Sequence, residues 1–209
     1  MTMAYLVQHG EKERLPGDPG LTQAGRAQAL RAGQWLRDQG IRTLYSSPMR
    51  RALQTADGIA SVTGLAIQTD ARLRERLNWD GRESYDAFLA RWARTTDDRD
   101  LVPAGGESAR QAGARLLAFL ADLAAPGPVA AVTHGGVTIE LLRTLLGDDG
   151  LPSDLLSAGV PPCAVTAVDD LHVVAIASRT SAPGDPSRPA RAGHVDREGE
   201  DLAGAGPGS

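Results

Sequence analysis

Residues 4 to 11 are Ala-Tyr-Leu-Val-Gln-His-Gly-Glu, and the fold can be worked out from this stretch. The apolar run from Ala4 to Val7 is typical of a short buried strand. His9 follows the carboxyl end of that strand, and Gly10 allows the backbone to turn sharply. Ligands of open α/β folds bind at the carboxyl edge of the parallel sheet. His9 is therefore either a surface histidine that happens to follow a strand or a histidine that faces a ligand pocket.

The rest of the chain alternates between strand patterns and helix patterns. Strands are predicted at 43–46, 65–69, 129–133, 164–168 and 171–177, and helices at 22–39, 47–63, 84–94, 107–123 and 139–146. Thr22 and Ser47 are the expected N-caps of the first two helices, and Pro48 is expected in the first helical position of the second. This alternation predicts a three-layer α/β/α fold, in which a largely parallel sheet carries helices on both faces.

Composition limits the class of protein. The 209 residues are 42% hydrophobic and carry a net charge of −4 without a basic stripe, so we expect neither a nucleic-acid partner nor a membrane partner. No apolar run is long enough to span a bilayer, and no signal-peptide pattern precedes Ala4. The single cysteine, Cys163, excludes an internal disulfide and a cysteine metal cluster. We expect a cytoplasmic enzyme or binding protein, whose oligomeric state the sequence leaves open.

The end of the chain differs from the rest. Residues 179–209 are rich in Gly and Pro and contain few large aliphatic side chains. Such a segment buries too little apolar surface to offset the entropy lost on ordering. We therefore predict one domain over residues 1–178, followed by a disordered tail.

A second histidine repeats the pattern of the first. His134 follows the apolar strand 129–133 and precedes Gly135, so two parallel strands would bring both imidazoles to one sheet edge. Arg50 and Arg51 lie in the first turn of the helix that follows strand 43–46, where free N–H groups and a guanidinium attract phosphate. This combination fits phosphoryl chemistry better than metal binding, so we expect no metal and no cofactor. His172 and His194 are interpreted as structural.

Six stretches in order give the chain a resemblance to a known family. They are residues 6–11 (Leu-Val-Gln-His-Gly-Glu), 21–29, 46–56, 73–76 (Leu-Arg-Glu-Arg), 105–108 (Gly-Gly-Glu-Ser) and 133–136 (Thr-His-Gly-Gly). Together they resemble the histidine phosphatase superfamily, whose fold is phosphoglycerate-mutase-like, over roughly residues 4 to 177. The resemblance implies a metal-independent phosphomonoester hydrolase with a phosphorylated small molecule as its substrate.

The resemblance also implies a role for each matching residue. His9 would be the nucleophile that forms a phosphohistidine, and His134 would stabilise charge in the transition state. Glu75 would donate a proton to the leaving oxygen. The phosphate site would be formed by Gln8, Arg51, Glu11 and Gly135.

The sequence allows further interpretations of two of the matching glutamates. Glu75 is flanked by Arg74 and Arg76, so a surface ion pair is the alternative to the catalytic role. Glu107 would lie beside the site together with Ser108. Arg115 would either tie its helix to that region or lie on a solvated face.

One position departs from the family pattern. The family signature has Arg-His-Gly, whereas this chain has Gln8 before His9. An amide gives up the charge and the bidentate geometry of a guanidinium. Two alternatives therefore stay open. The first is a phosphoglycerate-type mutase, although that branch usually has Ser after His-Gly-Glu and Asn shortly beyond, and residues 12–15 (Lys-Glu-Arg-Leu) supply neither. The second is a catalytically weakened protein that binds a phosphorylated ligand and has a regulatory role.

The substrate cannot be deduced from the sequence. Specificity should come from the irregular stretch 77–105. The candidate lining residues there are Trp79, Tyr85, Phe88 and Trp92. Trp79 is the better pocket candidate, because the other three have the helical spacing that is more typical of core residues.

Overall fold

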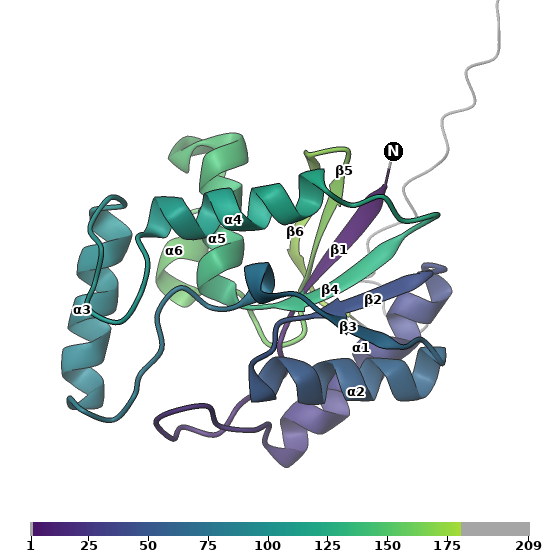
Figure 1. Ribbon diagram of the computed structural model, residues 1–209, viewed down its shortest axis with the longest axis horizontal. Helices are drawn as coiled ribbons and strands as arrows, with labels where there is room; N and C mark the ends of the chain where they lie inside the picture. The colour runs from purple at the N-terminus through teal and green to yellow at the C-terminus, as the bar shows by residue number, and fades with distance from the viewer. Residues whose placement is uncertain (1, 181–209) are drawn as a thin grey trace, which may run out of the picture.

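A six-stranded sheet in the order β3-β2-β4-β1-β5-β6 organises the computed structural model, which describes residues 2–180 (Figure 1). The strands are β1 (Met3–Gln8), β2 (Thr43–Ser46), β3 (Ile67–Thr69), β4 (Val129–Thr133), β5 (Val165–Asp169) and β6 (His172–Ser178). β1 pairs in parallel with β4, and β2 in parallel with both β4 and β3. β5 runs antiparallel to β1 and to β6. The predicted largely parallel sheet is confirmed, with an antiparallel hairpin at one edge.

Helices cover both faces of this sheet. They are α1 (Gln23–Asp38), α2 (Arg50–Thr63), α3 (Tyr85–Asp97), α4 (Ala109–Ala121), α5 (Gly135–Leu146) and α6 (Leu155–Ala158), with short 3-10 turns η1 (Ala71–Leu73) and η2 (Asp148–Gly150). In Figure 1, α1 and α2 lie below the sheet, and α4 and α5 lie above it. The predicted three-layer α/β/α architecture is therefore confirmed.

Two apolar cores hold the layers together. Leu36 of α1 and Ile59 of α2 are fully buried against the side chains of one sheet face. Leu116 of α4 and Leu141 of α5 are fully buried against the other face. The parallel strands alternate between these two cores, because successive side chains of a strand point to opposite faces.

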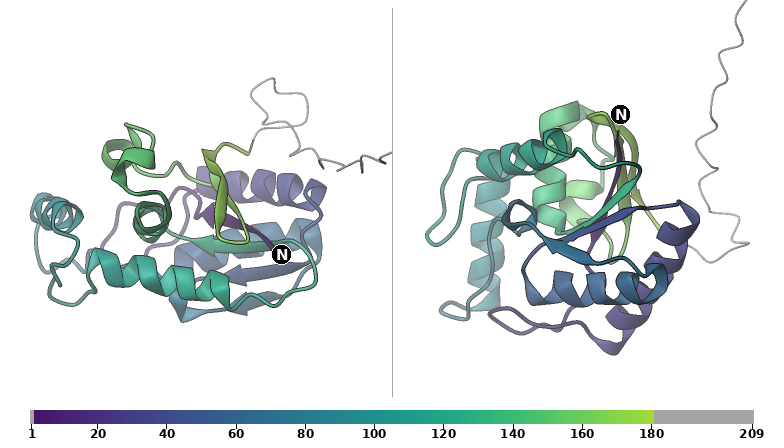
Figure 2. Two further views of the ribbon diagram at one scale, coloured as in Figure 1. Left: turned by 90° about the horizontal axis from the view of Figure 1, so that it is seen from above. Right: turned by 45° about the vertical axis from the view of Figure 1, so that its right-hand side comes forward.

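Helix α3 (Tyr85–Asp97) lies at the edge of the molecule, apart from the sheet (Figures 1 and 2). Ser84 caps it by accepting a hydrogen bond from the Ala87 N–H at 3.2 Å. Only Phe88 and Thr95 of this helix are buried, while Leu89 is 44% exposed. The predicted helix is therefore present, but the apolar side of α3 is only partly covered.

Two predicted helix starts are wrong. Ser47 does not cap α2, which begins at Arg50 with Met49 in the N-cap position. The Ser47 hydroxyl accepts from the Met49 N–H at 3.3 Å and lies 2.8 Å from Nε2 of His134. α5 begins at Gly135, four residues before the apolar spacing suggested, and His134 is its N-cap residue. The second correction places His134 directly at a helix N-terminus.

Most of the predicted tail lies outside the described residues, as does His194. Arg179 and Thr180 are the part of the tail that the structure describes, so the proposed domain boundary stays a prediction. No helix within residues 2–180 is long and apolar enough to cross a membrane.

Candidate active site

Two adjacent strands bring the two histidines together. Gln8 of β1 is paired with Thr133 of β4, so His9 and His134 leave the sheet side by side. Their ring centroids are 5.2 Å apart. His9 is 9% exposed and His134 is fully buried. The predicted pair of imidazoles at one sheet edge is present.

The ring of His9 is held with one nitrogen free to react. Its Nδ1 lies 2.8 Å from the carbonyl oxygen of Gly10, which can only accept, so Nδ1 carries the hydrogen. Nε2 then keeps its lone pair, and the Gln8 amide nitrogen lies 3.4 Å from it. Burial, reinforced by the charge of Arg51, lowers the pKa of His9 to about 3. His9 is therefore a neutral imidazole at physiological pH, which is the form that can act as a nucleophile.

Backbone packing fixes the turn that carries His9. A Cβ atom on Gly10 would lie 2.6 Å from the carbonyl oxygen of Gly25, at the start of α1. The Gly10 N–H donates to the Thr55 hydroxyl at 3.0 Å, and that hydroxyl donates to the Arg51 carbonyl at 2.8 Å. Thr55 thus connects the nucleophile's turn to the first turn of α2. Its position one helical turn after Arg51 is the sequence signal for this role.

Arg51 offers unused hydrogen-bond donors inside the site. It is the second residue of α2 and is only 3% exposed. Its Nη1 lies 3.5 Å from Asp18, but Nε and Nη1 are buried without a hydrogen-bond partner among residues 2–180. Buried donors are almost always satisfied, so these point to an anion. Arg50 is exposed, and its N–H donates to Asp18.

His134 and the N-terminus of α5 form the opposite wall. Nε2 of His134 lies 2.8 Å from the Ser47 hydroxyl, while Nδ1 has no partner within the described part of the chain. Burial, together with the charge of Arg51, holds the pKa of His134 well below its usual value. The helix that follows presents the N–H groups of Gly135 and Gly136 with the positive end of its dipole.

Glu75 lies beside that helix N-terminus. Its carboxylate accepts hydrogen bonds from the Gly136 N–H at 3.0 Å and from the Arg76 N–H at 2.8 Å. The alternative of an ion pair with its neighbours is wrong. Arg76 turns into the protein and donates to Thr95 at 2.6 Å, and Arg74 lies 4.0 Å from Glu107. The half-buried Glu75 carboxylate thus has no ion pair within the described residues and lies next to the histidines' sheet edge.

The remaining predicted residues lie around this centre. Glu11 is exposed and accepts a hydrogen bond from the Thr22 hydroxyl at 2.8 Å, so the structure ties its carboxylate to the start of α1. Its part in phosphate binding stays a prediction. Arg115 ties α4 to the chain near Glu75, because it donates to the Arg74 carbonyl at 3.0 Å and pairs with Glu107. Ser108 caps α4.

Lys12 belongs to the site, although the sequence analysis assigned it no role there. It is half-buried on the loop after His9, and its ammonium lies 3.5 Å from the Glu13 carbonyl. Burial, and then the charges of Arg51 and Arg14, lower the pKa of Lys12. The same ammonium contributes to the low pKa of His9. Lys12 therefore adds positive charge on the Arg51 side of the site, where Gln8 gives up the charge of the usual arginine.

A groove opens from the site toward α3. It has a volume of about 880 Å³ and runs from Gln8, Gly135 and Gly136 between α3, α5 and α6. Trp92 and Leu89 line the groove, so the structure favours the pocket interpretation of Trp92 over the core interpretation. Trp79, the predicted pocket residue, instead packs against Tyr85 with ring centroids 5.2 Å apart and donates its indole N–H to Glu83. No group of three or more His, Cys, Asp or Glu side chains within residues 2–180 is placed to hold a metal ion.

The family match decides the classification. The family model of the histidine phosphatase superfamily, branch 1, matches residues 4–171. The chain belongs to the histidine phosphatase superfamily. This confirms the predicted family and enzyme class, a phosphatase of the histidine phosphatase type.

Individual relatives share most of the chain's length. The chain is 32% identical to a glucosyl-3-phosphoglycerate phosphatase of Mycolicibacterium vanbaalenii, over 87% of this chain and 86% of that one. It is 36% identical to a probable phosphoglycerate mutase, GpmB, of Yersinia pestis, over 70% of this chain and 76% of that one. A mycobacterial glucosyl-3-phosphoglycerate phosphatase, solved with VO3, matches with a TM-score of 0.65 and 31% identity, over 80% of this chain and 92% of that one.

Proposed function

We propose that this protein hydrolyses phosphomonoesters through a phosphohistidine formed on His9. The observation that carries the proposal is the environment of His9. Its free Nε2 belongs to a neutral imidazole, and the buried Arg51 guanidinium nearby has donors without a partner among the described residues. A nucleophile beside unused anion donors fits phosphoryl transfer.

The first step transfers the phosphoryl group to the enzyme. Arg51 and the Gly135 N–H at the start of α5 hold the phosphoryl oxygens, and His134 adds a further contact. The His9 Nε2 lone pair forms the N–P bond while the bond from phosphorus to the ester oxygen breaks. A protonated Glu75 carboxyl delivers its proton to that oxygen, which leaves as an alcohol.

The second step releases phosphate. The Glu75 carboxylate, now unprotonated, takes a proton from water as the water oxygen attacks phosphorus. The N–P bond breaks, and its electron pair returns to Nε2 of His9. His9 is neutral again, and Glu75 is again protonated. The residues complete the cycle without a net gain or loss of protons.

A mutase is the second candidate, because the probable phosphoglycerate mutase of Yersinia pestis is 36% identical to this chain. In a mutase the phosphoryl group on His9 would return to a second hydroxyl of a phosphoglycerate instead of passing to water. Residues 12–15, which lack the Ser and Asn usual in that branch, favour the hydrolase.

A steady-state assay separates the candidates. We expect the protein to release phosphate from p-nitrophenyl phosphate, with no stimulation by bisphosphoglycerate and no loss of activity in EDTA. His9→Ala should abolish turnover. His172→Ala, which removes an exposed histidine of β6, should not. Turnover that requires bisphosphoglycerate would favour the mutase. A purely binding protein would retain phosphate affinity in both variants and release no product.

A further inference from the structure

The groove beside the candidate site begins where the leaving group of a phosphomonoester must lie. Glu75 protonates the leaving oxygen in the proposed mechanism, and its Oε2 accepts from the N–H of Gly136, a groove-lining residue. Gln8, whose amide lies 3.4 Å from the His9 Nε2, lines the same groove. The groove therefore extends outward from the point between nucleophile and acid.

Apolar side chains form much of the groove wall. Trp92 and Ile139 face it from α3 and α5, and Val160 closes it beyond α6. Two further lining residues, Leu89 and Leu156, are 44% and 42% exposed. Large aliphatic side chains that remain exposed together around one cavity are typical of a binding surface.

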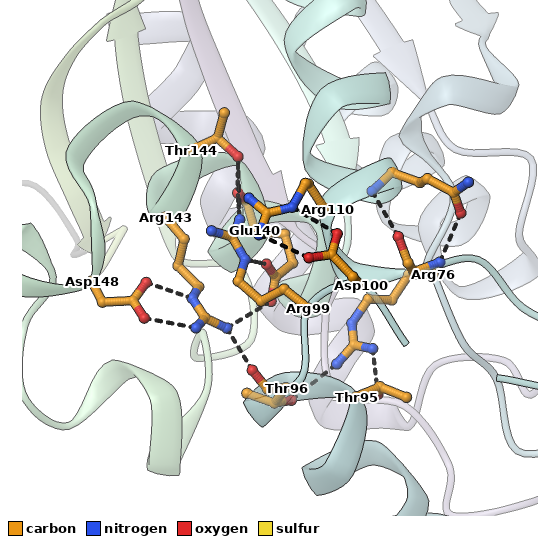
Figure 3. A network of polar contacts seen from close by, with 12 residues as sticks. Arg76, Thr95, Thr96, Arg99, Asp100, Arg110, Glu140, Arg143, Thr144 and Asp148 are labelled. Carbon is orange, nitrogen blue, oxygen red and sulfur yellow. Dashed lines mark hydrogen bonds and ion pairs between the residues drawn. The ribbon is translucent and has the colours of Figure 1, made fainter. Parts of the chain in front are cut away.

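The groove offers no free positive charge. Arg143 is the only cationic side chain among the described residues that line it. Its Nε and Nη2 each lie 2.7 Å from the Asp148 carboxylate, and its Nη1 donates to the Thr96 carbonyl at 2.8 Å (Figure 3). Glu140 neutralises Arg143 from the buried side at 3.3 Å. The guanidinium is thus occupied by partners within the protein.

Negative charge remains in the groove. Asp97, the last residue of α3, lines the groove, is exposed and has no ion pair within residues 2–180. The free cations of the site, Arg51 and Lys12, do not line the groove and lie on the phosphoryl side. An anionic group in the groove would meet a carboxylate without meeting a free cation, and like charges at this range are unfavourable.

We propose that this groove binds the alcohol part of the substrate, and that this part is uncharged and partly apolar. The inference rests on the proposed function. It places a phosphoglycerate, whose carboxylate would enter the groove, among the poor substrates of this chain. The phosphatase relatives described above carry phosphoglycerate in their names, so the proposal gives this chain a different substrate class.

Matched substrates test the charge preference. Benzyl phosphate and 4-carboxybenzyl phosphate have similar leaving alcohols and differ in one carboxylate. We expect kcat/KM to be about tenfold higher for benzyl phosphate. Asp97→Lys should raise kcat/KM for 4-carboxybenzyl phosphate and so lower the ratio of the two kcat/KM values several-fold. Asp57→Lys reverses an exposed charge on α2 outside the groove and should leave the ratio unchanged.

A second variant tests the apolar contact. Leu89→Ser should lower kcat/KM for benzyl phosphate about fivefold, because it removes apolar surface that the ring would cover. The variant should not change kcat/KM for β-glycerophosphate, whose alcohol part is small, polar and uncharged. Leu89 is exposed, so the variant should keep the melting temperature of the wild type.

The outcomes separate the two proposals. Suppose that p-nitrophenyl phosphate is hydrolysed. Equal kcat/KM values for the two benzyl esters would then overturn the groove inference alone, as would the same ratio of these values in Asp97→Lys and Asp57→Lys. If no phosphomonoester is hydrolysed and His9 takes up no phosphate, the proposed function fails, and the inference fails with it.

Discussion

Replacing Gln8 by arginine should strengthen phosphate binding. The Gln8 amide lies 3.4 Å from the His9 Nε2, and its Oε1 is buried without a partner in the described residues. Gln8 also lines the groove, so a longer side chain has space to extend. The variant would add a guanidinium beside the position that the phosphoryl group occupies when His9 attacks.

The size of the effect follows from the type of hydrogen bond. A charge-assisted bond contributes about 1.5–3 kcal/mol and a neutral bond about 0.5–1.5 kcal/mol, so the gain is about 1 kcal/mol. That difference corresponds to up to about tenfold in kcat/KM and in the inhibition constants of phosphate and vanadate. The added cation also keeps the pKa of His9 low, so the nucleophile stays neutral.

The assay compares wild type, Gln8→Arg and Gln8→Met on p-nitrophenyl phosphate. Gln8→Met keeps the length of the side chain without the amide and should weaken phosphate inhibition. Phosphate and vanadate inhibition constants that are the same in all three proteins would show that residue 8 does not touch the phosphoryl group. A fall in kcat for Gln8→Arg with tighter phosphate binding would instead show that product release has become slow.

Three further predictions concern stability and pH. Thr55→Val leaves the buried Gly10 N–H without its acceptor, so we expect a loss of about 1–3 kcal/mol in urea unfolding together with lower kcat; an unchanged kcat would contradict its positioning role. Because the folded-state pKa of His9 is about 3 and its unfolded value is near 6.5, the unfolded state binds an extra proton between these pH values. The unfolding free energy should therefore fall as pH drops from 6.5, by up to about 1.4 kcal/mol per pH unit. This dependence on pH should be weaker in His9→Asn, and the same dependence in both proteins would refute the lowered pKa of His9. Glu140→Leu removes the buried partner of Arg143 and should cost about 3–5 kcal/mol, measured as a lower melting temperature, whereas an unchanged melting temperature would show that the pair adds nothing.

The strands could be predicted because their signal is local. β4 has the predicted limits, since the run from Val129 to Val132 is apolar and all five residues of the strand are buried. The start of α5 could not be predicted in the same way. Gly135 and Gly136 are poor helix formers, so the first turn of α5 lacks a helix signal of its own. Tertiary contacts allow the earlier start, because the Gly136 N–H donates to Glu75, which is far away in sequence.

The same difference between local signals and tertiary contacts applies to the candidate site. His9, Arg51 and His134 could be found because each follows a strand and two of them precede glycine. The groove could not be found, because its walls come from three helices between residues 89 and 160 that meet only in the folded chain. Glu140 looks like an ordinary surface charge in the sequence, yet it is 1% exposed and paired with Arg99 and Arg143 (Figure 3).

A phosphoryl group on the His9 nitrogen is the central claim, and direct detection tests it most sharply. The protein would be mixed with benzyl phosphate labelled with phosphorus-32, quenched in alkaline denaturant within milliseconds and analysed for bound label. We predict label that is stable in alkali, lost in acid and located in the peptide that contains His9. It should be absent from His9→Ala and present in His172→Ala. Label on another residue, or equal label in wild type and His9→Ala, would contradict the account.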